Sequence, residues 1–439
     1  MATNKIIYFA LLGLGKLGSG FYKVWQERRE SFIEKSGYDI RLKKILIKHA
    51  DFVRPSFVDP DMLTDNPDDI IKDKEIQIVI DAIGGIEPPY SIIRKLLNSG
   101  KHLISANRML LASKMHDLAT LANKNNVYIL PEPSLGGGIP IISTLQKDLI
   151  ANKITSVVGI MSGTSNYILT QMTEKNISFQ EVLKTKKIQK LGESLSFVDY
   201  EGSDAAQKTS ILAAAAFGIN VNFLHLYAQG ISGITLDDIN YASDFGYEIK
   251  LLAIIREHQD KFEVRVHPTL VPKNHPLNAV KSEYNAYYIQ TDLLGEYMIL
   301  GKGVGIEATN SLIIRDLLGL AEKIIFSEFN INYNPARNKK PLLSMQDLES
   351  SYYARFPCSD KPGVFGKITS IFGRYNINIS SAHADIAKEL PPHSAYVHIF
   401  VNNAREKNFK RAIRYISKLD FIISDIKYFR ILELADELS

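Results

Sequence analysis

The chain has 439 residues, of which 45% are hydrophobic and 23% are charged. This composition is typical of a globular protein, and the length predicts roughly two to four domains rather than a single core. There are 52 lysine and arginine residues against 48 aspartate and glutamate residues, so the net charge is only +4. So small an excess excludes a dedicated nucleic-acid surface as the default interpretation.

The cysteine count and the hydropathy of the chain limit the cellular compartment and the kinds of disulfide, metal or membrane-spanning features that we expect. The single cysteine, Cys358, excludes an intramolecular disulfide and a cysteine-rich metal site, and it favours a reducing compartment. The first residues carry no charged leader or small-residue cleavage site, and the most apolar run, 211–219, is about half the length that a bilayer requires. We therefore expect a cytoplasmic protein with no membrane or nucleic-acid partner.

A glycine-rich loop follows the first predicted strand. Residues 6–12 are almost continuously apolar, and Gly13-Leu14-Gly15-Lys16-Leu17-Gly18 separates them from an amphipathic segment that runs to about residue 35. Between a strand and a helix, such glycines allow a tight turn, close approach to a pyrophosphate, and packing of helix on strand. We expect cofactor contacts from Gly13, Gly15, Lys16, Leu17 and Gly18.

The pattern continues as alternating strands and helices. A strand at 42–47 ends in Lys48, where an NAD-specific site usually has an acidic residue, so the cation favours a 2′-phosphate and hence NADP over NAD. A solvated loop lysine is the alternative. Further strands are predicted at 76–81, 102–105 and 127–130, with helices at 90–98 and 109–124. This order predicts a Rossmann-type, doubly wound parallel sheet over residues 1–132.

Two turns at the carboxyl ends of these strands are candidate ligand contacts, because ligands of open α/β sheets bind at that edge. One is Gly84-Gly85-Ile86-Glu87-Pro88 and the other is Ser105-Ala106-Asn107-Arg108. Ordinary loop chemistry would explain one of them. The cofactor candidates here are Gly84, Gly85, Ser105 and Arg108.

The pattern changes at residues 131–140, which contain three consecutive glycines. These glycines let backbone groups converge on a ligand or ion, or they form a hinge between domains. A helix is expected to 149, followed by strand patterns at 157–166, 264–270, 286–291 and 297–300. We expect an α+β substrate-binding and dimerisation domain over 133–335, with Gly303 as a further cofactor contact.

A separate unit is expected after the polar, linker-like stretch 335–347. Strands at 352–356, 377–380, 395–401 and 422–431 alternate with helices at 364–375 and 408–419. The order β-α-β-β-α-β is that of a ferredoxin-like domain, here 348–439.

Charged residues gather in the middle domain around Lys208. Asp204 lies four residues before Lys208 on one predicted helix, and Glu193 and Asp199 precede it. A surface ion pair is the structural alternative. Near a nicotinamide, a lysine can donate a proton to a carbonyl oxygen as hydride arrives, and carboxylates can hold a substrate ammonium. A lysine with an ordinary pKa of about 10.4 is ready to act as that acid at pH 7.

Together these residues resemble the homoserine dehydrogenases, which interconvert L-aspartate 4-semialdehyde and L-homoserine with NAD(P)H. The resemblance covers essentially the whole chain, and Asp199-x-x-Gly-x-Asp204-Ala-Ala-x-Lys208 is its most specific motif. It implies that Lys208 is the proton donor, that Glu193 and Asp204 bind the substrate amino group, and that Asp199 supports them. It also implies a structural sodium ion on the carbonyl groups of Glu132, Leu135, Gly137 and Ile139.

The C-terminal unit is similar to an ACT domain, a module that senses small molecules. In this family the resemblance implies feedback inhibition by L-threonine, with Asp360 and Gly363 at the strand–helix turn as regulatory contacts. An ACT domain without a ligand that serves only as a dimer surface is the alternative. We expect a homodimer or homotetramer.

Some positions depart from the family pattern. Arg108 replaces a lysine that contacts the cofactor, Ser162 replaces an asparagine, and Ser194-Leu195-Ser196 alters the segment after Glu193. Arg108 keeps the charge but does not release a proton near neutral pH. Two alternatives therefore remain open: an oxidoreductase of the same fold with another substrate, and a catalytically inactive sensor of amino acids and nucleotides.

Overall fold

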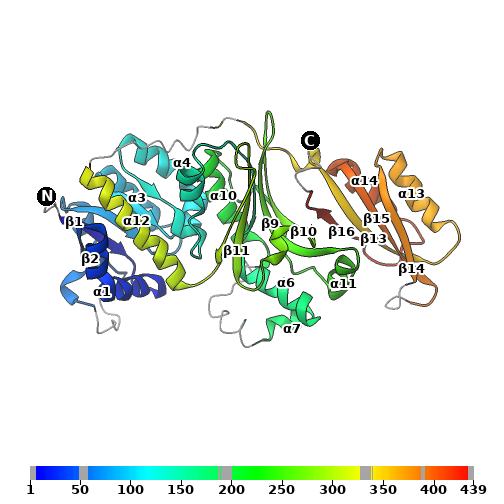
Figure 1. Ribbon diagram of the computed structural model, residues 1–439, viewed down its shortest axis with the longest axis horizontal. Coiled ribbons are helices and arrows are strands. Elements are labelled where there is room, and N and C mark those ends of the chain that lie inside the picture. The colour runs from blue at the N-terminus through cyan, green and yellow to red at the C-terminus, as the bar shows by residue number, and fades with distance from the viewer. Residues whose placement is uncertain are drawn as a thin grey trace.

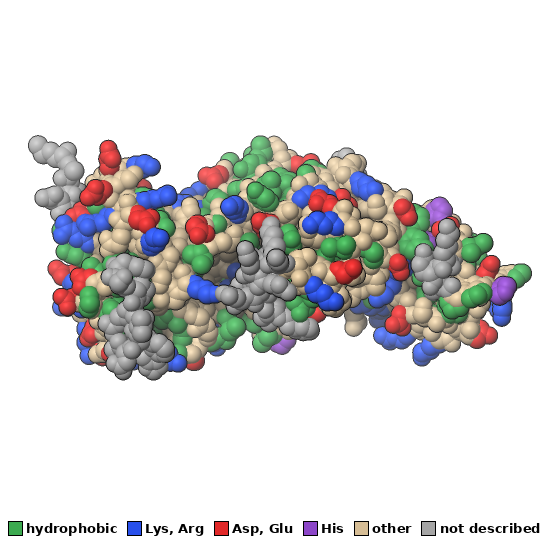
Figure 2. All heavy atoms as spheres, turned by 90° about the horizontal axis from the view of Figure 1, so that it is seen from below, with side chains coloured by type: hydrophobic (Ala, Val, Ile, Leu, Met, Phe, Trp, Pro, Cys, Tyr) green, Lys and Arg blue, Asp and Glu red, His purple; other side chains and the backbone are tan. Residues whose placement is uncertain are grey.

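A computed structural model describes residues 6–48, 58–185, 188, 200–326, 338, 340–386 and 391–433. The molecule is elongated, with the N-terminal sheet at one end, a mixed sheet in the middle and the C-terminal domain at the other end (Figure 1). Acidic and basic side chains are interspersed over the face shown in Figure 2. In the described ranges, we find no helix with the length and apolar character needed to span a bilayer.

The N-terminal sheet is parallel, with the strand order β3-β2-β1-β4-β5-β6. This confirms the predicted doubly wound architecture, in which the strand order reverses between β1 and β4. The strands are β1 (Ile6–Leu12), β2 (Asp39–Leu46), β3 (Leu63–Thr64), β4 (Ile76–Asp81), β5 (His102–Ser105) and β6 (Ile129–Leu130). The helices are α1 (Lys16–Ser36), η1 (Pro60–Met62), α2 (Asp68–Ile71), α3 (Pro89–Asn98) and α4 (Arg108–Lys124).

A helix from much later in the chain completes this domain. Helix α12 (Ile306–Phe326) packs against α1, and its buried residues Ile313 and Leu317 join the core that contains Phe9, Phe21 and Trp25. The expected domain boundaries assign residues 306–326 to the middle domain, whereas this helix lies against the first sheet. The chain therefore crosses between the two domains twice, once near residue 132 and again near residue 305.

The middle of the molecule is built on a second, mixed sheet. Its strands are β7 (Ile154–Ile160), β8 (Tyr227–Ala228), β9 (Tyr247–Glu257), β10 (Phe262–Pro272), β11 (Tyr284–Thr291) and β12 (Glu296–Lys302). The helices are η2 (Glu132–Leu135), α5 (Ile141–Ser143), η3 (Thr144–Asp148), α6 (Gly163–Lys175), α7 (Phe179–Leu183), α10 (Ser203–Phe217), α11 (Leu236–Asp244) and η4 (Pro276–Ala279). The helix expected up to residue 149 is one α-helical turn followed by a π-helical turn.

The C-terminal domain has the predicted β-α-β-β-α-β order. After η5 (Met345–Asp347) it comprises β13 (Glu349–Ser359), α13 (Val364–Arg374), β14 (Ile379–Ile386), β15 (Ser394–Arg405), α14 (Glu406–Ile416) and β16 (Lys427–Ile431). Its last strand pairs in parallel with β10, where Thr269 lies opposite Arg430 and Leu270 opposite Ile431. The middle and C-terminal domains therefore share one ten-stranded sheet.

A buried ion pair also holds the C-terminal domain in place. Arg355 on β13 lies 2.6 Å from Asp238 on α11, and both side chains are at most 5% exposed. The guanidinium also lies over the rings of Tyr241 and Tyr396, at 4.8 and 5.0 Å from their centroids. A desolvated pair of this kind is sensitive to loss of either partner, because the remaining charge is left buried. The two domains are thus joined by side chains as well as by backbone pairing.

Candidate active site

In the glycine loop after β1, the first and third glycines have no room for a side chain, whereas the second has open space around it. Gly13 has φ +94°, and a Cβ there would lie 2.9 Å from the carbonyl oxygen of Ala82. A Cβ at Gly18 would overlap the carbonyl oxygen of Gly13, whereas a Cβ at Gly15 would have no heavy atom within 4 Å. Helix α1 begins at the exposed Lys16, next to the half-buried Leu17. This geometry fits a pyrophosphate that approaches Gly15 at the helix N-terminus.

The two neighbouring turns are tied together by hydrogen bonds around Asp81, at the end of β4. Ser105 is fully buried and its hydroxyl donates to Asp81 over 2.9 Å, while the backbone N–H of Ile83 donates to the same carboxylate over 3.1 Å. Asn107 Nδ2 donates to the carbonyl oxygen of Gly85 over 2.8 Å. Gly84 is exposed beside them, so both turns contribute to the same edge of the sheet.

Lys48 lies just beyond β2, and its side chain is exposed. Strand β2 is the neighbour of β1 in the sheet, so the carboxyl ends of the two strands share an edge. This is the edge from which the glycine loop leaves β1. A cation at Lys48 is therefore available to a group bound beyond that loop.

The carboxylate of Asp204 lies between two cations at the junction of the first two domains. One oxygen, Oδ1, accepts a hydrogen bond from Arg108 at the start of α4, and the other, Oδ2, is 2.8 Å from Lys208 Nζ. Arg108 Nε also donates to the carbonyl oxygen of Ser134, over 2.9 Å. The side chains of Asp204 and Lys208 are only 8% and 4% exposed. The structure therefore brings the half-buried Arg108 together with the buried Asp204 and Lys208 in a single cluster.

The ammonium of Lys208 has a second acceptor. Its Nζ donates to the carbonyl oxygen of Met161 over 2.7 Å, and Asn285 Nδ2 donates to the same oxygen over 3.1 Å. Met161 directly follows β7, and Asn285 lies on β11. Three N–H donors radiate from a lysine ammonium. Asp204 and Met161 accept two of these N–H groups and so fix the orientation of the ammonium.

The charges of the cluster act strongly on Asp204. Burial by itself raises the pKa of this carboxyl, but the positive charges of Arg108 and Lys208 outweigh burial and lower it below its ordinary value. Asp204 is therefore ionised at neutral pH. With two cations and one carboxylate the cluster carries a net charge of about +1, so Asp204 is already compensated before any substrate ammonium approaches.

The triple-glycine segment forms the wall behind this cluster. Gly136 has φ 72° and ψ 163°, and a Cβ there would lie 2.9 Å from a guanidinium nitrogen of Arg108 and 3.8 Å from Lys208 Nζ. A Cβ at Gly137 would overlap the carbonyl oxygen of Lys302. A Cβ at Gly303 would overlap the side chain of Asn285. Glycine at these positions lets the backbone pass close to the Arg108 guanidinium, the Lys302 carbonyl group and the Asn285 amide.

The carbonyl groups assigned to a cation lie in the same segment. Glu132 and Leu135 are the first and last residues of η2, and Gly137 and Ile139 follow it. The Glu132 carboxylate is engaged elsewhere, since it accepts from the backbone N–H groups of Ile142 and Ser143 over 2.8 Å each. No cluster of three His, Cys, Asp or Glu side chains suited to a metal occurs in the described residues. The donors for a cation here are therefore backbone oxygens, the type that hard cations prefer.

Not every predicted site residue can be located. Glu193 and Asp199 lie outside the described residues. In the C-terminal domain, Gly363 has φ +88° and precedes α13, and Asp360 is exposed with its backbone N–H donating to the carbonyl oxygen of His393. These two residues belong to a different domain from the cluster around Lys208.

Sequence reasoning missed three polar groups. Asp81 gave a usable signal, because a carboxylate at the end of an otherwise apolar strand is unusual. The carbonyl group of Met161 and the amide of Asn285 gave none, because their role depends on a contact between residues 124 positions apart.

Comparison with known proteins identifies similar sequences along the chain. Family models described as homoserine dehydrogenase, as the NAD-binding domain of homoserine dehydrogenase and as the ACT domain match residues 140–318, 13–132 and 352–420, respectively. A homoserine dehydrogenase of Neisseria gonorrhoeae is 33% identical, over 98% of this chain and 100% of its own length. One from Helicobacter pylori is 34% identical, over 98% and 99%.

Solved structures agree with the sequence comparison. A homoserine dehydrogenase from Thiobacillus denitrificans superposes with a TM-score of 0.87 at 33% identity, covering 98% of this chain and 99% of that one. The enzyme from Staphylococcus aureus gives a TM-score of 0.77 at 29% identity, covering 98% and 100%. The similarity therefore extends through all three domains.

Replacing Asp81 by asparagine should change how stability depends on pH. Burial raises the pKa of Asp81 to about 6, although hydrogen bonds from Ile83 and Ser105 oppose that shift. The stability conferred by the neutral carboxyl is complete below about pH 4 and is lost as the pH rises to about 6. A two-unit shift corresponds to at most about 3 kcal/mol. Asp81→Asn stays neutral, so its thermal unfolding midpoint should rise relative to wild type between pH 4 and 7.

Asp39→Asn is the control for this experiment. A hydrogen bond from Arg41 lowers the pKa of Asp39, so its stabilising effect is present at neutral pH and is lost as the pH falls through the lowered pKa. The difference in unfolding midpoint between this variant and wild type should change with pH in the opposite direction. If the difference between Asp81→Asn and wild type stays constant over the whole pH range, the assignment is contradicted.

Two glycines separated by one residue should respond differently to alanine. Gly136 has a backbone conformation that essentially only glycine adopts, so Gly136→Ala should cost about 1–3 kcal/mol and displace Arg108. The three atoms nearest to a Cβ at Gly138 all belong to Ala308 and lie 3.5–3.8 Å away, which is ordinary contact, so Gly138→Ala should be tolerated. Calorimetry on the two variants checks this, and an equal loss of thermal stability in both would count against the argument.

Proposed function

Because the chain belongs to the homoserine dehydrogenase family, we propose that Lys208 is the acid that protonates the carbonyl oxygen of L-aspartate 4-semialdehyde as it becomes L-homoserine. The observation that carries this proposal is the placement of the Lys208 ammonium. It is almost completely buried, and Asp204 and the Met161 carbonyl group hold it in one orientation. Such a fixed donor can meet a developing alkoxide without reorganisation.

In this proposal the protein supplies the proton and the cofactor supplies the hydride. A bound reduced nicotinamide supplies the hydride. Lys208 gives one proton to the substrate oxygen, becomes a neutral amine and is recharged by a proton from solvent. Arg108 stays paired with Asp204 throughout, so the carboxylate is not left buried and uncompensated when Lys208 loses its charge. In the oxidation direction Lys208 must first be deprotonated, which favours alkaline conditions.

The substrate ammonium needs a carboxylate partner. We assign this role to Glu193 and Asp204, with Asp199 in support. Both oxygens of Asp204 are already engaged by cations, so the proposal needs a second carboxylate, and the sequence motif offers Glu193. The assignment of Glu193 and Asp199 rests on their place in the sequence motif.

We assign the cofactor site to the glycine loop and the two turns beside it, with Gly303 at its inner side. NADP is the preferred cofactor in this proposal, because Lys48 is exposed at the edge where a 2′-phosphate would lie. A sodium ion on the carbonyl groups of Glu132, Leu135, Gly137 and Ile139 would stiffen the segment that supports Arg108. Two observations favour this sodium site: backbone oxygens are ligands that hard cations prefer, and Gly137 packs closely against Lys302.

Control by L-threonine through the C-terminal domain completes the proposal, with Asp360 and Gly363 as the contacts suggested by sequence. The ACT domain match supports an amino-acid effector. We also propose that the protein works in the cytoplasm as a homodimer or homotetramer. We propose the domain limits 1–132, 133–335 and 348–439, with α12 of the second segment docked on the first domain.

Replacing Lys208 should remove turnover but preserve cofactor binding. Loss of a positioned acid typically costs about 10²–10⁴ in rate, so kcat for homoserine oxidation at alkaline pH should fall by that factor in Lys208→Ala. The Arg108–Asp204 pair remains in this variant, so the site keeps a compensated carboxylate. Lys208→Arg is the matched variant, since it keeps the charge without an accessible proton. Wild-type turnover in either variant would identify another acid.

Reversing the charge at Lys48 should shift cofactor preference. In Lys48→Asp we expect the KM for NADP to rise roughly tenfold, which corresponds to about 1.4 kcal/mol, with little change for NAD. Lys124→Asp makes the same charge change at the C-terminal end of α4, the end opposite Arg108, and should leave the KM for NADP and the KM for NAD unchanged. Steady-state kinetics with each dinucleotide decide the matter, and an equal response of NAD and NADP would refute the 2′-phosphate role.

A further inference from the structure

The carbonyl oxygen of Met161 accepts two hydrogen bonds from side chains of different elements. Lys208 on α10 donates over 2.7 Å, and Asn285 on β11 donates through Nδ2 over 3.1 Å. Strand β11 pairs antiparallel with β7, and the register that places Ala286 opposite Ile160 brings Asn285 beside Met161. The group that orients the Lys208 ammonium is therefore itself held by a side chain of the neighbouring strand.

The Asn285 side chain is buried, and its amide lies close to the backbone of Gly303. It is 1% exposed, and among the described residues its Oδ1 has no hydrogen-bond partner. Since the Met161 oxygen can only accept, the amide nitrogen must face it and Oδ1 must point away. A buried acceptor without a partner lowers stability, and an alanine at this position would avoid that cost. What the amide adds over an apolar side chain is the bond that it donates to Met161.

Asn285 differs from the other polar groups near the ammonium because it carries no charge at any pH. The titratable or charged side chains around the cluster, from the elements packed against it, are Asp204, Arg108, Glu132, Tyr287 and Arg315. Burial raises the pKa of Glu132 to about 7, and burial also raises the pKa of Tyr287 above its ordinary value. Between about pH 8 and 10, Lys208 is thus the member of this set that we expect to titrate.

The shared oxygen lets Asn285 act on the proton of Lys208. The positive end of the Asn285 N–H dipole lies at the same oxygen as the ammonium, so it disfavours the charged lysine. A carboxylate in place of the amide would lie within about 6 Å of Nζ, because both groups approach one oxygen, and would favour the charged lysine. Asparagine, alanine and aspartate at position 285 therefore give Lys208 three graded environments.

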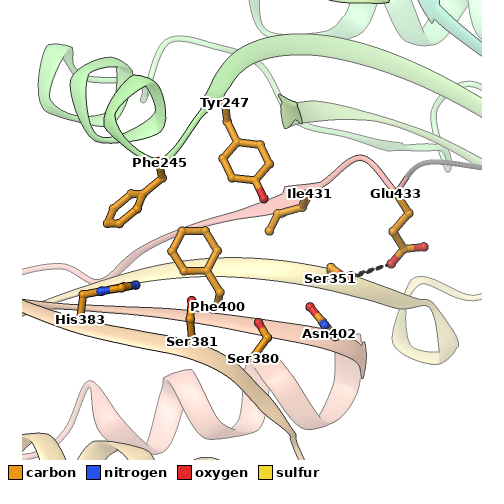
Figure 3. A pocket seen from close by; sticks show the side chains of 10 residues that line it. All are labelled: Phe245, Tyr247, Ser351, Ser380, Ser381, His383, Phe400, Asn402, Ile431 and Glu433. Atoms are coloured by element: carbon orange, nitrogen blue, oxygen red, sulfur yellow. Dashed lines mark hydrogen bonds between the residues drawn. The ribbon is translucent and has the colours of Figure 1, made fainter. Parts of the chain in front are cut away.

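Asn285 is separate from the contact between the middle and C-terminal domains. A cavity of about 270 Å³ lies at that contact, with Phe245 and Tyr247 on one side and strands β13 to β16 on the other (Figure 3). The described residues that line this cavity do not include Asn285, Met161 or Lys208. A substitution at position 285 is therefore expected to act on the Lys208 cluster without disturbing the domain contact.

We propose that Asn285 is a positioning residue for the proton transfer, which holds the Met161 carbonyl group so that the Lys208 ammonium keeps one place and one orientation. The proposal rests on the role of Lys208 proposed above and extends it to a residue that does not itself carry the proton. Because the two donors come from β11 and α10, the shared oxygen ties the helix of the acid to the sheet. Gly303, a proposed cofactor contact, packs against the same amide.

The pH dependence of homoserine oxidation by the full-length enzyme tests this role. In wild type, kcat should rise with pH as Lys208 loses its proton. In Asn285→Ala we expect kcat to fall about tenfold, because the acid is misplaced, with a much smaller change in the KM for homoserine. The midpoint of the rise should move up by about 0.5 pH unit in Asn285→Ala and by about one unit or more in Asn285→Asp. Asn285→Asp keeps the size of the side chain, so it tests the role even if Asn285→Ala does not fold.

Asn278→Ala is the matched control. Asn278 is also a buried amide of the middle domain, and its Nδ2 donates to the carbonyl groups of Val271 and Pro272. Its Oδ1 likewise has no hydrogen-bond partner within the part of the chain that the structure describes. We expect this variant to lose thermal stability but to keep the kcat and the midpoint of wild type.

The proposal is overturned if both variants at position 285 keep the wild-type midpoint, or if Asn278→Ala moves it as far as Asn285→Ala does. Loss of turnover in Lys208→Ala together with unchanged behaviour of the Asn285 variants would contradict this proposal alone. Wild-type turnover in Lys208→Ala would instead show that the proposed acid is wrong, and the role of Asn285 would fall with it.

Discussion

The arrangement of the first two domains depends on one buried carboxylate. Asp204 on α10 in the middle domain binds Arg108 at the start of α4 in the dinucleotide domain through one oxygen. Its other oxygen binds Lys208, one turn later on the same helix. Removing one partner of such a buried pair usually costs about 3–5 kcal/mol, because the remaining charge loses its compensation. The same interaction therefore sets the domain contact, the ionisation of Asp204 and the position of the proposed acid.

The surroundings of this carboxylate explain why small residues and backbone groups dominate the site. Gly136 leaves room for the Arg108 guanidinium, Gly303 leaves room for Asn285, and the Met161 carbonyl group accepts from both Asn285 and Lys208. Backbone oxygens have no side-chain torsions to fluctuate, so they hold a donor in a narrow range of positions. Helix α12 stabilises this arrangement because it packs against α1 and joins the core of the first domain.

Local pattern predicted the elements well, and long-range contacts were its limit. The position of the glycine loop between a strand and a helix followed from local pattern, and the β-α-β-β-α-β order followed from spacing. The pairing of Arg108 with Asp204 was not predictable, because it joins residues 96 positions apart. The same holds for the docking of α12 and for a cavity that brings Phe245 near Glu433. An amphipathic helix shows in sequence that it packs, but not against which domain.

The pairing of β16 with β10 has a consequence for any shortened form of the protein. A chain that stopped after α12 would lose the partner of β10 around Thr269 and Leu270 and would uncover Phe245 and Tyr241. Unpaired backbone groups beside bared aromatic rings are a template for strand addition from another molecule. The C-terminal domain covers this edge, so a form without it is expected to aggregate more readily than the full chain.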